Sequence, residues 1–151
     1  MRTTIVGEYE DFAAASRAAA SLMIAGFPQA QIGIVGRYVA LHDDDAEGGG
    51  RAQFAFAGTI ARGLTGAVEH DFDERLVCAL SRLGVPPAAS RRHASALEGG
   101  GGLVVLQTSP DDVRRAEAAM RQHATVATYA VGPVPIARGA RVCDELRIRA
   151  A

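Results

Sequence analysis

The sequence predicts an α/β sandwich with a ferredoxin-like split βαβ core and a helical insertion between the second and third strands. The order strand, acid-capped helix, strand occurs at residues 3–41 and again at 103–131. Two such units, with both helices on one side of a four-stranded antiparallel sheet, make this core. We therefore expect one domain over residues 1–131, an insertion at about 52–98 and a C-terminal tail at 132–151.

The first unit begins with a β-branched segment, residues 3–9 (TTIVGEY). Small and apolar residues then recur at helical spacing from Glu10-Asp11 to Gly26, where Gly26 and Pro28 provide a stop. Residues 31–41 (QIGIVGRYVAL) predict the second strand.

The insertion follows an acidic, glycine-rich stretch at residues 42–51, which we expect to be an exposed loop. Apolar residues from Phe54 to Val68 recur at helical spacing among several glycines and predict a helix lined with small residues. Two further helices are expected, the first beginning near Asp71 or Asp73 and the second running from Pro86 or Pro87 to Glu98.

The second unit contains the most continuously apolar run of the chain, residues 103–108 (LVVLQT), which suits a central strand. Ser109, Pro110 and Asp112 mark a helix start, and residues 124–131 (ATVATYAV) predict the last strand. With both long helices on one face, the other face of the sheet needs a cover. We expect either the inserted helices or a second copy of the protein there, because an open apolar face would be an exposed patch.

Composition narrows the classes of function. The formal net charge of −1 gives no field that would attract nucleic acid, so no nucleic-acid partner is expected. Cys78 and Cys143 form no CxxC pair, which fits a reducing cytoplasm, and no stretch is apolar for long enough to span a membrane. The first eight residues reach Glu8 before any apolar export region forms, so a cytoplasmic location is expected.

Two groups of side chains are candidates for binding. His70, Asp73 and Glu74 lie close together in the sequence and are a candidate metal site, although helix capping and surface charge explain such a cluster more often. Arg91, Arg92 and His93 are a candidate anion-binding group, although a solvated helix face with a packed histidine is the commoner outcome. No nucleophile and base can be paired from the sequence, so we expect neither a catalytic residue nor a cofactor.

Several short motifs carry a family resemblance. Leu83 to Leu106 contain a Gly-Val-Pro helix start, a glycine run and an apolar strand, and Val6-Gly7-Glu8-Tyr9, Gly26-Phe27 and the strand at 32–35 fit the preceding half. This order resembles the general stress protein 17M-like (heat-induced stress protein) family, whose glycine-zipper segment would correspond to residues 54–68. The chain departs from that pattern at Arg62, which interrupts the segment, and at His93, where an aromatic residue is expected. The resemblance implies a bacterial cytoplasmic protein linked with stress, with no established catalytic residues.

The sequence therefore favours a non-catalytic, cytoplasmic, stress-related protein that acts through self-association, as a homodimer, or through partner binding. The alternative is a sensor of a small anion or metabolite, since sandwiches of this kind often bind metabolites at sheet edges; that argument is one of fold analogy. A metal-binding enzyme using His70, Asp73 and Glu74 is a third hypothesis.

Overall fold

The computed structural model describes residues 2–39, 52–58, 60, 64, 72–98, 100–121 and 124–131. Its strands are β1 (Arg2–Tyr9), β2 (Ile32–Val39), β3 (Ala52–Gly58), β4 (Gly102–Thr108) and β5 (Ala124–Val131). Its α-helices are α1 (Phe12–Ile24), α3 (Phe72–Arg82), α4 (Pro87–Ala96) and α5 (Val113–Met120), with short 3-10 turns η1 (Gln29–Gln31) and η2 (Pro110–Asp112).

The five strands form one sheet in the order β3-β2-β4-β1-β5, and every neighbouring pair is antiparallel. The two ends of the chain are interleaved, because β4 lies between β1 and β2 while β1 lies between β4 and β5. Ile5 pairs with Leu106 and Val6 with Val105, so the first and third core strands are direct neighbours. The α+β class is confirmed, and the narrower ferredoxin-like assignment stays a prediction.

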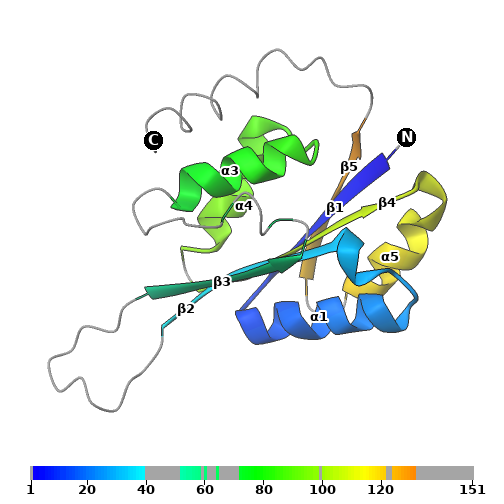
Figure 1. Cartoon of the computed structure of the whole chain (residues 1–151), viewed down its shortest axis with the longest axis horizontal. Helices are drawn as coiled ribbons and strands as arrows, with labels where there is room; N and C mark the ends of the chain where they lie inside the picture. The colour runs from blue at the N-terminus through cyan, green and yellow to red at the C-terminus, as the bar shows by residue number, and fades with distance from the viewer. Residues whose placement is uncertain are drawn as a thin grey trace, which may run out of the picture.

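Helices α1 and α5 pack together on one face of the sheet (Figure 1). Their layer buries Ile5, Val104 and Leu106 of the strands against Leu22 of α1 and Met120 of α5. Helix α1 begins where Asp11 accepts a hydrogen bond from the Ala14 amide at 2.7 Å, as expected for an acid at the N-cap. The shared face of the two long helices is confirmed.

Helices α3 and α4 lie on the opposite face of the sheet (Figure 1). Alternate strand residues point to this side, and Val6, Leu103 and Val105 belong to one buried cluster with residues of both helices. Phe72, Leu76 and Leu80 are the large buried residues of α3, and Ala89 and Ala94 contribute from α4. Of the two covers expected for this face, the inserted helices are the one observed, so dimerisation is not needed to bury it.

The segment predicted as a glycine-containing helix over 54–68 begins instead as a strand. Residues 52–58 (AQFAFAG) pair antiparallel with β2, from Val39↔Ala52 to Gly33↔Gly58. Phenylalanine and alanine alternate at 54–57, a period of two that a strand satisfies at least as well as a helix. Pairing with β2 decides between the two, and it adds a fifth strand at the sheet edge. Ile60 and Leu64, which follow, are buried in the α3–α4 layer.

The end of α3 is joined to the sheet by polar contacts. The Leu83 carbonyl accepts hydrogen bonds from the Thr4 hydroxyl on β1 and from the Gln107 amide on β4, the latter at 3.4 Å. Thr4 is fully buried, so its hydroxyl needs such a partner. The insertion is therefore attached by directional bonds as well as by apolar packing.

Two predicted segments, the acidic loop at 42–51 and the tail at 132–151, lie outside the described residues. Within the residues that the structure does describe, no helix has the length and hydropathy needed to cross a membrane.

A buried histidine network as the candidate functional site

His93 lies on the face of α4 that packs toward the sheet. The helix starts at Pro87, a residue whose fixed φ suits the first helical position. Its buried residues are Ala89, Ser90, His93 and Ala94, so spacings of three to five residues place His93 on the inner face. His93 is 4% exposed.

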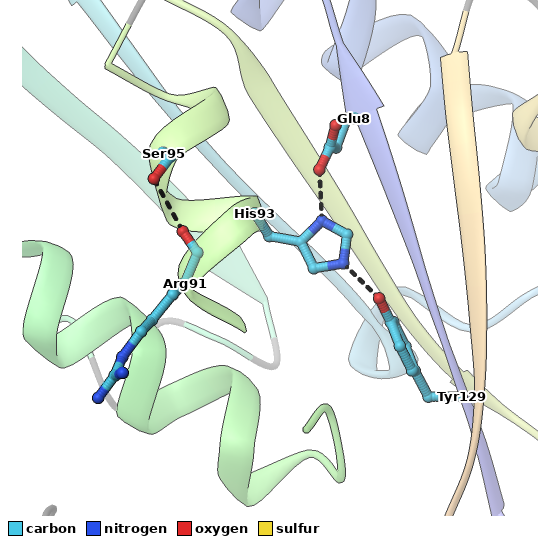
Figure 2. A network of polar contacts seen from close by, with 5 residues as sticks. All are labelled: Glu8, Arg91, His93, Ser95 and Tyr129. Carbon is cyan, nitrogen blue, oxygen red and sulfur yellow. Dashed lines mark hydrogen bonds and ion pairs between the residues drawn. The ribbon is translucent and has the colours of Figure 1, made fainter. Parts of the chain in front are cut away.

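The His93 ring joins α4 to two strands of the sheet (Figure 2). Its Nδ1 lies 2.6 Å from a carboxylate oxygen of Glu8 on β1, and its Nε2 lies 2.8 Å from the Tyr129 hydroxyl on β5. The rings of His93 and Tyr129 meet edge to face, with centroids 5.9 Å apart. We call Glu8, His93 and Tyr129 the histidine network.

The chemistry of the three groups fixes the tautomer that a neutral imidazole would have at this position. An ionised carboxylate only accepts hydrogen bonds, so Nδ1–H of His93 donates to Glu8. Nε2 of the neutral imidazole is then an acceptor, and the Tyr129 O–H donates to it. Both ring nitrogens of a nearly buried side chain are thus satisfied, which matches the rule for buried polar groups.

Arg92, the residue before His93, also acts electrostatically on Tyr129. Burial raises the pKa of Tyr129, the charge of Arg92 and a hydrogen bond from it lower this pKa, and the charge of Glu8 raises it, with a net upward shift. The phenol is therefore protonated at neutral pH. It is positioned to donate to His93 rather than to attack a substrate as a phenolate.

A carboxylate, an imidazole and a hydroxyl in this order also occur where a base activates a nucleophile. Here the surroundings of the ring favour a structural role, in which His93 joins α4 to the sheet. A catalytic imidazole must exchange a proton with substrate, whereas this ring is 5% exposed in its side chain and has both nitrogens engaged. A buried ring that is hydrogen-bonded at both nitrogens stiffens and specifies the contact it spans. The geometry is suited to holding α4 against β1 and β5.

The structure places the three residues of the predicted anion-binding group in different surroundings. Arg91 and Arg92 are exposed, whereas His93 is buried and turned toward the sheet. Figure 2 shows the Arg91 side chain directed away from the His93 ring. The packed-histidine interpretation of His93 agrees with its position.

Two of the three predicted metal ligands, Asp73 and Glu74, lie in the described part of the chain. Asp73 and Glu74 are exposed in the first turn of α3, where their negative charge favours the helix N-terminus. His70 lies outside the described residues. Among the residues that were placed, no group of three or more His, Cys, Asp or Glu side chains could hold a metal ion.

The sequence pointed to His93 but not to its partners. Glu8 is separated from His93 by 85 residues and Tyr129 by 36, so no local spacing links them. The available signal was a carboxylate inside an otherwise uncharged strand, since Glu8 interrupts residues 3–9 (TTIVGEY). A charged side chain inside a strand that is otherwise buried calls for a partner.

Comparisons of the chain with models of protein families, with curated proteins and with solved structures found no match to any of them.

Proposed function

We propose that this protein is non-catalytic and acts by associating with a second copy of itself, or with a partner protein, through the edges of its sheet. The observation that carries the proposal is the character of the two edge strands. Among the described residues, β3 pairs only with β2 and β5 only with β1. Each edge strand therefore has one side on which none of the described strands pairs with it.

The edge strands lack the features that usually prevent such pairing. Proteins protect open edges with charged residues, proline or bulges, because the free N–H and C=O groups are a template for another strand. Residues 52–58 (AQFAFAG) and 124–131 (ATVATYAV) contain neither a charged residue nor a proline. Ala57 on β3 and Thr128 on β5 are exposed. An extended segment in antiparallel orientation fits an edge of this kind.

A sheet edge supports this proposal better than a sheet face does. Both faces are covered within the chain, one by α1 and α5 and the other by α3 and α4. Pairing of like edges about a two-fold axis is isologous, so a homodimer needs no second binding surface.

The test measures oligomeric state by sedimentation velocity, from low micromolar to submillimolar concentration. Ala57→Lys and Thr128→Lys place a charge on one edge each, so each variant is the matched control for the other. We expect a wild-type dimer, and a dissociation constant that rises at least about tenfold in one variant and stays unchanged in the other. A wild-type monomer throughout the concentration range, together with no strand-adding partner in cross-linking, would refute the proposal.

A cytoplasmic location and a role in stress belong to this proposal. They are supported by the cysteine pattern, by the N-terminal residues and by the family resemblance of the sequence. Protein abundance measured in the source organism under heat, osmotic and oxidative challenge tests the link with stress. Constant abundance under all three would remove it.

A further inference from the structure

We propose that the partner is a second copy of the chain, that β3 makes the contact, and that the two β3 strands pair antiparallel about a two-fold axis at Ala55. This inference rests on the proposed function and adds to it the edge, the partner and the register of pairing. Its starting point is the sequence of β3, in which Phe54-Ala55-Phe56 reads the same in both directions.

Two-fold symmetry restricts how an edge strand pairs with its own copy. In a continuous antiparallel sheet, residues directly opposite each other point to the same face, and side chains alternate between the faces along each strand. Two paired positions are therefore separated by an even number of residues in the sequence. The two-fold axis consequently passes between one residue and the same residue of the copy.

Strand β3 fits this restriction along its whole length. It has seven residues, Ala52–Gly58, so an axis at the central residue, Ala55, pairs every one of them. Phe54 then lies opposite Phe56 of the partner subunit, and this pair occurs twice, once on each side of the axis. Aromatic residues at directly opposite positions stabilise antiparallel strands. The sequence of β3 is thus complementary to itself in this register.

The described residues at the β3 edge are compatible with an added strand. On its inner side β3 pairs with β2, from Val39↔Ala52 to Gly33↔Gly58, and none of the described strands pairs with its outer side. Ala57 and Gly58 are exposed, and both are small and uncharged. An incoming strand therefore meets neither a bulky nor a charged side chain at these two positions.

The other edge, β5, is less suited to pairing with its own copy. It has eight residues, so an axis at one residue leaves at least one of them unpaired. A charged pair from α5 also lies beside it, because Glu117 accepts a hydrogen bond from the Thr128 hydroxyl and forms an ion pair with Arg121 at 3.3 Å. Charges beside an edge oppose the addition of a strand, since pairing removes water from them. These features favour β3 as the edge that associates.

Paired charge substitutions test the register. Position 53 lies opposite position 57 of the partner subunit, so charges at these two positions meet twice across the axis. Gln53→Glu with Ala57→Lys creates two attractive pairs, whereas Gln53→Lys with Ala57→Lys creates two repulsive pairs at the same positions. Sedimentation velocity of the full chain measures the dimer dissociation constant of each variant. We expect this constant to be at least about tenfold lower for the attractive variant, and the reversed combination, Gln53→Lys with Ala57→Glu, to match the attractive one.

Disulfide formation tests the position of the axis. Ala55 and its copy are a directly opposite pair, with Cα atoms about 4.5–5.5 Å apart, a distance that a disulfide spans. Ala57 and its copy are displaced by about 13 Å along the strands, which a disulfide cannot span. On mild oxidation we expect Ala55→Cys to link to itself and Ala57→Cys not to. Because the chain also contains Cys78 and Cys143, mass spectrometry of the linked peptides identifies the cysteines involved.

The outcomes distinguish failure of this inference from failure of the proposed function. A wild-type protein that stays monomeric would overturn the inference, while a strand-adding partner found by cross-linking would preserve the proposed function. A wild-type dimer with equal dissociation constants for the attractive and repulsive variants would rule out pairing through β3. A dimer in which Ala57→Cys links to itself at least as readily as Ala55→Cys would rule out the axis at Ala55. In both of these cases association itself would remain established.

Discussion

Replacement of Tyr129 by phenylalanine tests whether the histidine network stabilises the fold. The substitution keeps the aromatic ring, which packs partly buried against the α3–α4 layer, and removes only the hydroxyl. Nε2 of His93 then loses its partner at 2.8 Å within a side chain that is 5% exposed. An unsatisfied buried polar group costs about 1–3 kcal/mol, so we expect a loss of that size in the free energy of unfolding at pH 8.

Thr128→Val is the matched control on the same strand. The Thr128 hydroxyl donates a hydrogen bond to Glu117 at 2.6 Å. This bond is shorter than the 2.8 Å contact between Tyr129 and His93, but it is exposed to solvent. Water replaces a lost exposed bond, so we expect a change below about 0.5 kcal/mol. Urea unfolding of the wild type, Tyr129→Phe and Thr128→Val, fitted with a common denaturant slope, measures the change in the free energy of unfolding for each variant. Equal losses of unfolding free energy in the two variants, or no loss in Tyr129→Phe, would contradict the prediction. Either result would show that the buried bond between His93 and Tyr129 stabilises the fold no more than an exposed one does.

Burial raises the pKa of Tyr9 to about 12, from the ordinary 10.0. Because the folded-state pKa is the higher one, the stability from protonated Tyr9 is full below about pH 10 and is lost as the pH rises to about 12. The loss is at most about 3 kcal/mol, and Tyr9→Phe should abolish this dependence on pH. Parallel stability–pH curves for the two proteins would contradict this. Gly102→Ala should destabilise the protein by about 1–3 kcal/mol by overpacking, since its Cβ would lie 2.7 Å from the Ala15 Cβ and 2.9 Å from the Asp11 carbonyl oxygen. An unchanged thermal midpoint would show that α1 can move away from β4.

Local sequence patterns predicted most elements of the core because their causes are local. Asp11 caps the helix that follows it, and Gly26 with φ +97° ends it, as glycine alone does without strain. The apolar run LVVLQT forms a strand buried on both faces, with alternate residues in the two core clusters. These properties depend on residues a few positions apart.

Strand β3 shows where local pattern is insufficient. Its phenylalanines and alanines fit both a period of two and a helical face, and only pairing with β2 selects the strand. The choice of a cover for the second sheet face was also open in the sequence. Burial of Val6 and Val105 against α3 and α4 decides it in favour of the insertion.

The amino-acid sequence by itself determined the α+β class, the order of the core elements and the burial of α4's inner face, because hydrophobic periodicity and helix-end residues act over short distances. Only the tertiary structure decided that Glu8 and Tyr129 become the partners of His93. Strand order sets that contact, since β1 lies beside β5 and α4 crosses the face they share. A hydrogen bond between residues 85 positions apart leaves no spacing in the chain from which it could be inferred.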